Sequence, residues 1–273
     1  MKLWKYIIIF FTIIFCGAYA FDWPLKPKIL LSSFCQNNGD GFSTGIHLSG
    51  ANEPVYAIAP GELIFSHKEG ENNFALPYGL GSFMVLWHKG GIQSVYCQLE
   101  TETLNIDKTK IEKEKMIGTV GDTGSTIGNN LRLILIDIEE NEILNPVKNL
   151  IPYYEDTKEP VIRGVYIKRN DEIIQLQDNQ IISPGNAEIL VESYDLREDM
   201  QRIWKIAPYQ VILIYNGQKQ KEISFDAIRE KDNRQITDVG EFEYSDVYEE
   251  DWMFKLGNID YSLSNAVYRY LVI

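Results

Sequence analysis

Side chains that can bind a metal ion or move a proton are scarce in this sequence. The chain has three histidines, and the candidates for a metal site are His47, His67, His88, Cys97 and Asp40. A catalytic zinc ion needs three donors from His, Asp, Glu or Cys and one open position for water. His67 and His88 are interpreted as surface or turn-adjacent residues. A metal site built from these candidates is therefore not expected.

Two cysteines, Cys35 and Cys97, lie beyond the N-terminal segment. They could pair in an oxidising compartment, but two well-separated thiols do not make a disulfide framework. Two buried, unpaired thiols fit the sequence equally well. Because side chains alternate along a strand, Cys97 is expected on the opposite face from Gln98.

One predicted strand carries a polar pair. Asn130 and Arg132 are two residues apart and therefore point to the same face of a strand. The Arg132 guanidinium has the geometry to bind a carboxylate through paired hydrogen bonds. Alternatively, Arg132 pairs with a local acid such as Asp137 or Asp40, and the sequence leaves both possibilities open.

The elements that must position these side chains are predicted to be strands. Apolar runs alternate with turn signals, and helical periodicity is nearly absent. Lys89-Gly90-Gly91 and Asn216-Gly217 are hairpin signals, and Pro60-Gly61 suits a type II turn. The predicted strands are Val55–Ala59, Leu63–Ser66, Phe83–Trp87, Ile92–Cys97, Leu131–Ile136, Val161–Arg169, Ala187–Tyr194, Tyr209–Tyr215, Glu222–Phe225 and Val267–Ile273.

Composition excludes several classes of protein. The 273 residues are 45% hydrophobic, which is too high a fraction for a disordered chain. The formal charge of −13 argues against a nucleic-acid partner and against tight binding to anionic membrane surfaces. Aromatic residues make up 12% of the chain, which favours a β-rich protein.

The N-terminus has the pattern of a secretory signal peptide spanning residues 1–20. Lys2 and Lys5 precede the apolar run Tyr6–Phe15, and Ala18-Tyr19-Ala20 forms a cleavage site. The run is shorter than the roughly 20 residues that span a bilayer, so no stable transmembrane anchor is expected after cleavage. The alternative is an uncleaved anchor. The mature protein is expected in the periplasm or cell envelope.

The remainder divides into two halves of different composition. Residues 21–151 are expected to form one domain, because residues 21–150 contain 14 of the 20 glycines. Residues 151–273 contain 11 of the 16 tyrosines, and residues 152–160 form a polar segment bracketed by prolines. We expect a linker at 152–160 and a small β-sandwich domain at 161–273. The predicted fold class is all-β.

The first half resembles the LytM/lysostaphin-type zinc endopeptidases, family 23 of the metallopeptidases. Seven short pieces in the family's order carry the resemblance over about a hundred residues. They are Phe42–Leu48, Pro54–Ala57 with Pro60-Gly61, Gly79–Val85, Ser94–Leu99, Ile117–Ser125, Gly128–Arg132 and Leu144–Pro146. The resemblance implies an antiparallel sheet with an active-site groove on it.

The family's functional residues are replaced at every matching position. The three zinc ligands fall on Ser43, His47 and Arg132, and the two catalytic histidines fall on Asn130 and Gln98. Ser43 is a poor zinc ligand, and a guanidinium has no lone pair to give. Gln98 and Asn130 cannot act as general acids or bases. We therefore expect no catalytic residue, no bound metal and no cofactor.

Three functions remain open. The resemblance favours an inactive homologue that binds peptidoglycan or a cell-wall hydrolase through the former groove, because family members without zinc ligands regulate cell-wall amidases or act as scaffolds. The first alternative is an active metal-dependent peptidoglycan endopeptidase with unusual ligands. The second is a structural or adhesive surface protein that acts through its C-terminal β-domain.

Overall fold

The computed structural model describes residues 20–39, 41–71, 79–105, 108–177, 185–197, 204–215, 217–232, 234–260 and 268–272. The expected signal peptide lies outside these residues, apart from its last position. Among the described residues, no helix is long and apolar enough to cross a membrane.

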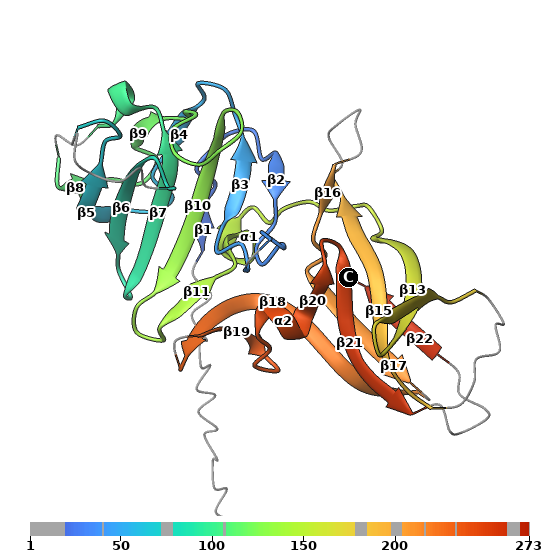
Figure 1. The fold of residues 1–273 in the computed structure, drawn as a ribbon. Coiled ribbons are helices and arrows are strands. Elements are labelled where there is room, and N and C mark those ends of the chain that lie inside the picture. The colour runs from blue at the N-terminus through green and yellow to red at the C-terminus, as the bar shows by residue number, and fades with distance from the viewer. Residues whose placement is uncertain are drawn as a thin grey trace, which may run out of the picture.

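The described chain is built almost entirely from antiparallel strands, which confirms the predicted all-β class (Figure 1). The single parallel pair among the described strands joins β1 to β12. The first half contains β1 (Phe21–Asp22), β2 (Leu30–Ser32), β3 (Ile46–Ser49), β4 (Pro54–Tyr56), β5 (Gly61–His67), β6 (Ser82–His88), β7 (Ile92–Leu99), β8 (Lys110–Ile111), β9 (Met116–Thr119), β10 (Asn130–Asp137), β11 (Glu142–Leu144), α1 (Pro146–Asn149) and β12 (Leu150–Ile151).

The second half forms a second layered unit of strands. It contains β13 (Val161–Arg169), β14 (Glu172–Gln175), β15 (Asn186–Leu196), β16 (Lys205–Ile206), β17 (Gln210–Tyr215), β18 (Gln218–Lys231), β19 (Arg234–Val239), α2 (Tyr244–Val247), β20 (Tyr248–Glu250), β21 (Met253–Asp260) and β22 (Tyr268–Val272). One sheet has the order β14-β13-β15-β21-β20, and β17, β18 and β22 belong to another.

Turn chemistry predicted two hairpins correctly. β6 and β7 pair antiparallel across Lys89-Gly90-Gly91, where both glycines adopt positive φ. β17 and β18 pair from Tyr215 to Gln218, around the expected Asn216-Gly217 turn, although Asn216 lies outside the described residues. Pro60-Gly61 differs, because β4 pairs with β9 while β5 pairs with β6 and β8. It joins two strands that do not form a hairpin.

One sheet crosses the boundary expected between the halves. Strand β11 pairs antiparallel with β18, which belongs to the second half (Figure 1). The resulting sheet has the order β22-β17-β18-β11-β10-β7-β6-β5-β8. The expected linker, residues 152–160, carries no helix or strand. The two halves are therefore joined by backbone hydrogen bonds as well as by the chain itself.

Side chains also pack across this junction between the two halves. Phe42 lies beside Phe225 of β18 and Tyr248 of β20, with ring centroids 6.4 and 6.3 Å away. Asn145, the N-cap of α1, donates from its side chain to the backbone oxygen of Phe225 at 2.8 Å. Trp204 of the second half donates to the backbone oxygen of Leu31 in β2 at 2.6 Å. A single buried apolar cluster runs through both halves.

A charged network at the junction predicts a pH effect. Lys148 and Tyr209 both contact the carboxylate of Asp226, and Ser224 donates to it at 2.8 Å. Burial acts to raise the pKa of Asp226, but hydrogen bonds from Tyr209, Ser224 and Lys148 outweigh it and lower the pKa. A carboxyl with a lowered folded pKa stabilises above its unfolded pKa, and this contribution is lost as the pH falls through the folded pKa.

We therefore expect the stability advantage of the wild type over Asp226→Asn to shrink below about pH 4, near the ordinary aspartate pKa. Urea unfolding of both proteins between about pH 3 and pH 7 measures this difference. A difference that stays constant across that range would contradict the role assigned to the carboxylate.

Candidate functional site

Strand register brings three of the relevant side chains into one row. His47 of β3 is the direct partner of Arg132 in β10, and Arg132 is the direct partner of Cys97 in β7. Directly opposite residues on neighbouring strands project to the same face. Asn130 lies two residues before Arg132 and shares this face.

Hydrogen bonds fix how these side chains are held. His47 Nδ1 lies 2.8 Å from Asn130 Oδ1. The amide nitrogen of Asn130 donates to Thr126 and to the backbone oxygen of Gly128, so its oxygen faces His47 and His47 Nδ1 carries the hydrogen. Arg132 Nη2 donates to Thr44 Oγ1 at 2.8 Å. We call Thr44, His47, Asn130 and Arg132 the Arg132 site.

The pKa values of the two neighbours of Arg132, His47 and Cys97, are shifted so that both are uncharged at neutral pH. Burial, followed by the charge of Arg132, lowers the pKa of His47, although its hydrogen bond with Asn130 acts in the opposite direction. Burial raises the pKa of Cys97 to about 12, and Arg132 offsets this only in part. At neutral pH the imidazole and the thiol are therefore uncharged, and Arg132 is the cation of the row.

Arg132 has no acidic partner among the described residues. No ion pair is formed by its guanidinium there, and its buried Nε has no hydrogen-bond partner. Asp137, one of the two acids considered from the sequence, instead accepts hydrogen bonds from the backbone of Glu139 and Glu140 at 3.0 and 3.1 Å. Asp40, the other, lies outside the described residues.

The other two expected residues are not hydrogen-bonded to this site. The Ser43 hydroxyl donates to the backbone oxygen of Gly45 at 3.0 Å. Gln98 is 1% exposed, and its side-chain oxygen has no hydrogen-bond partner. The structure thus groups His47, Asn130 and Arg132, and it adds Thr44 and Thr126, which the sequence interpretation missed. Thr44 is the neighbour of a matched position, and this was the one available signal.

Cys97 lies on the same face of the sheet as Arg132. Gln98 has a positive φ of 65°, and the β6–β7 register shifts at this point, so a β-bulge interrupts the alternation. Tyr96 and Leu99 both belong to the main core, whereas Cys97 packs in a second cluster on the face of Arg132. Cys35 and Cys97 are both buried and unpaired, which answers the open question of their pairing.

His88 was interpreted as a surface or turn-adjacent residue, and the structure supports the second: it ends β6 directly before the turn at Lys89, but it is buried. His88 is 2% exposed, and its ring nitrogens contact the Pro60 oxygen at 2.9 Å and Ser94 Oγ at 2.7 Å. It is a core histidine whose hydrogen bonds hold the start of β5 against β6 and β7. His67, at the end of β5, lies beside Phe83 with ring centroids 5.7 Å apart.

Zinc, which the resemblance implies for active members, does not fit these residues. Arg132 places a guanidinium without a free lone pair where a ligand is needed. His47 Nδ1 is hydrogen-bonded to Asn130, and the Ser43 hydroxyl donates to the backbone oxygen of Gly45. In the described part of the chain, no group of three or more His, Cys, Asp or Glu side chains could hold a metal ion.

The loop before β10 borders the Arg132 site and is tightly held. Thr123 Oγ1 donates to the backbone oxygen of Leu99 at 2.9 Å, and Ser125 N donates to that of Gly79 at 3.0 Å. The side-chain amide of Asn130 donates hydrogen bonds to Thr126 and to the backbone oxygen of Gly128, the residues on either side of Ile127. Between these contacts Ile127 is fully exposed.

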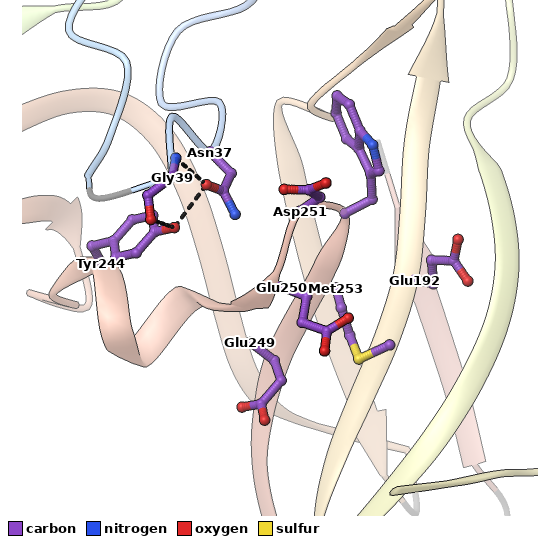
Figure 2. Close-up of a pocket in the computed structure, with 9 residues that line it drawn as sticks. Asn37, Gly39, Glu192, Tyr244, Glu249, Glu250, Asp251 and Met253 are labelled. Carbon is purple, nitrogen blue, oxygen red and sulfur yellow. Dashed lines mark hydrogen bonds between the residues drawn. The ribbon is translucent and has the colours of Figure 1, made fainter.

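A cavity of about 580 Å³ lies elsewhere, at the junction of the halves. In Figure 2, Asn37, Gly39 and Tyr244 lie together at one end, joined by hydrogen bonds from the Tyr244 hydroxyl. None of the five residues expected from the sequence lines it. The lining residues are Asn37, Gly39, Glu192, Tyr244, Glu249, Glu250, Asp251, Trp252 and Met253.

Comparison with known proteins identifies the first half. Residues 41–146 match the model of peptidase family M23. This part of the chain is therefore an M23 peptidase-family domain, and the resemblance to LytM/lysostaphin-type enzymes is confirmed. A second family model, whose description names no function, matches residues 159–263. No curated protein sequence matches the chain.

Solved structures of similar proteins cover part of the chain. A zinc-containing peptidase from Vibrio cholerae is 21% identical over 42% of this chain and 36% of its own, with a TM-score of 0.36. The catalytic domain of lysostaphin from Staphylococcus simulans is 19% identical over 38% of this chain and 76% of its own, with a TM-score of 0.33. The SpoIIQ–SpoIIIAH pore-forming complex matches at 18% identity over 49% of this chain and 92% of its own, with a TM-score of 0.40.

Proposed function

We propose that this protein is an exported M23-family homologue that has exchanged zinc chemistry for binding. Its Arg132 site binds a carboxylate of a cell-wall peptide or of a cell-wall hydrolase or other envelope protein. The observation that carries the proposal is the state of Arg132. Its guanidinium is held by Thr44 beside a neutral His47 and has no acidic partner among the described residues. Export rests on the N-terminal sequence pattern alone.

Physical chemistry supports an anionic ligand. A half-buried guanidinium prefers a partner that accepts hydrogen bonds and carries negative charge, and a carboxylate does both. The chain contains 39 acidic residues, yet none of the described ones pairs with Arg132. An external carboxylate would therefore meet a cation that the protein itself leaves unneutralised. His47, neutral and hydrogen-bonded, adds polarity without competing charge.

The test compares a soluble cell-wall tetrapeptide that ends in a free carboxylate with the same peptide amidated at that end. The wild-type protein is expected to prefer the free carboxylate. Arg132→Gln should weaken binding of the carboxylate form by about 10- to 100-fold, the size of a charge-assisted hydrogen bond, and leave the amide form unchanged. Calorimetric titration measures both constants.

Arg163→Gln is the matched control, because Arg163 lies in β13 of the second half and is largely exposed. It should bind like the wild type. Equal binding of the carboxylate by Arg132→Gln and wild type, with both folded, would overturn the proposed site.

A further inference from the structure

Ile127 is the most exposed large apolar side chain among the described residues, at 102% of its reference area. Isolated surface apolar residues are common and need no explanation by themselves. Ile127 differs because the chain is fixed on both sides of it. Ser125 is bound to Gly79, and Thr126 and Gly128 are bound to Asn130. The loop therefore presents this side chain to solvent in a defined position.

The residues on either side of Ile127 are hydrogen-bonded to Asn130 of the Arg132 site. Thr126, the residue before Ile127, contacts the same Asn130 amide group that orients His47. Arg132 lies two positions beyond Asn130 on the same face of β10, a separation of roughly 7 Å along a strand. Ile127 therefore lies in the loop whose neighbouring residues, Thr126 and Gly128, are hydrogen-bonded to a residue of the Arg132 site.

Electrostatics explains why an apolar contact is needed there. The chain carries a formal charge of −13, so its overall field repels an anionic ligand at long range. Salt screening limits the attraction of Arg132 for a carboxylate to separations of roughly 10 Å or less, so it acts only at close quarters. Burial of apolar surface does not depend on charge, so it adds affinity that the acidic surface does not oppose.

We infer that the Arg132 site recognises an acidic peptide segment of a protein partner, with its carboxylate on Arg132 and a large apolar side chain beside that carboxylate packed against Ile127. This inference rests on the proposed function and names the ligand class for the same site. A polymer that offers sugar hydroxyls or only alanine-sized side chains leaves Ile127 without an apolar partner. A leucine-sized neighbour covers it.

The test uses three blocked pentapeptides titrated by calorimetry into the full mature chain. They are Ac-Ala-Leu-Glu-Leu-Ala-amide, Ac-Ala-Ala-Glu-Ala-Ala-amide and Ac-Ala-Leu-Gln-Leu-Ala-amide. The wild type should bind the first about 3- to 10-fold more tightly than the second, the size expected for burying part of an isoleucine side chain. It should bind the third far more weakly than the first, because the charge is missing.

Two variants separate the apolar contact at Ile127 from the carboxylate contact at Arg132. Ile127→Ser should abolish the preference for leucine over alanine but keep the preference for glutamate over glutamine. Ile138→Ser is the matched control, because Ile138 is 45% exposed in the turn after the far end of β10, and it should keep both preferences.

Each failure has a distinct meaning. Equal binding of the leucine and alanine peptides by the wild type, or a leucine preference that survives Ile127→Ser, overturns the inference and leaves the carboxylate site standing. Equal binding of the glutamate and glutamine peptides overturns the carboxylate site, and the inference falls with it. Circular dichroism of each variant confirms that a lost preference does not come from a lost fold.

Discussion

Replacing Phe225 with alanine is expected to lower the free energy of unfolding of the whole chain by about 3–5 kcal/mol, the range measured for a large-to-small change in a packed core. Phe225 is 1% exposed and lies on β18 of the second half. Its ring contacts Phe42 of the first half, and its backbone oxygen accepts the Asn145 side chain. The cavity would open where the halves meet.

The loss should be shared by both halves. The buried apolar cluster is continuous across the junction, and the β11–β18 pairing ties the two halves into one sheet. Urea unfolding followed by tryptophan fluorescence reports on both, because Trp23 and Trp87 lie in the first half and Trp204 and Trp252 in the second. A single transition that moves to lower urea is the expected result.

Phe65→Ala provides the control with the same chemical change. Phe65 is 54% exposed and stacks on Phe83 with ring centroids 5.5 Å apart. Its loss should lower stability by about 1 kcal/mol, the value of a surface aromatic pair. Two separate transitions, of which only one responds to Phe225→Ala, would show that the halves are energetically independent.

Gly124→Ala is expected to destabilise the protein by about 2–5 kcal/mol, the sum of a left-handed backbone penalty and a steric clash. Gly124 has a φ of +77°. A Cβ atom there would lie 2.4 Å from the Gly81 nitrogen and 2.8 Å from the Gly79 oxygen. Both are backbone atoms, so neither can turn aside as a side-chain end could. The loop that presents Ile127 would have to move.

Gly128→Ala isolates the backbone term in the same loop. Its φ is +78°, almost the same, but a Cβ atom added there would meet no other part of the chain within 4 Å. It should lose only about 1–2 kcal/mol, the left-handed penalty alone. Chemical denaturation of both variants measures the difference, and peptide titration should show weaker binding for Gly124→Ala. Equal losses of stability would refute the steric argument.

Local sequence signals predicted much of this fold. A run rich in β-branched and aromatic residues, bounded by Pro160 and Asn170, indicated β13 at its observed bounds, Val161–Arg169. Lys89-Gly90-Gly91 marked a hairpin since glycine accepts the positive φ that the turn requires. The polar stretch after Phe225 concealed β19, and β18 extends well beyond its predicted end. Burial there is partial, so the pattern is weak.

The candidate site, like the fold, could be predicted from the sequence only in part. The sequence alone indicated an all-β chain whose first half keeps the order of M23 motifs, and the resemblance implied that Ser43, Gln98 and Arg132 stand where the family has functional residues. These are matters of residue type and spacing, which the sequence contains in full.

Only the tertiary structure determines which of these residues contact one another. Strand register pairs Cys97 with Arg132, and the bulge at Gln98 returns Leu99 to the core side with Tyr96, because one extra residue in a strand reverses the side of those that follow. Arg132 binds Thr44 rather than Asp137, and β11 pairs with β18, more than eighty residues later in the chain. Such contacts arise from strand register and from the packing of distant segments, and no local run of residues encodes them.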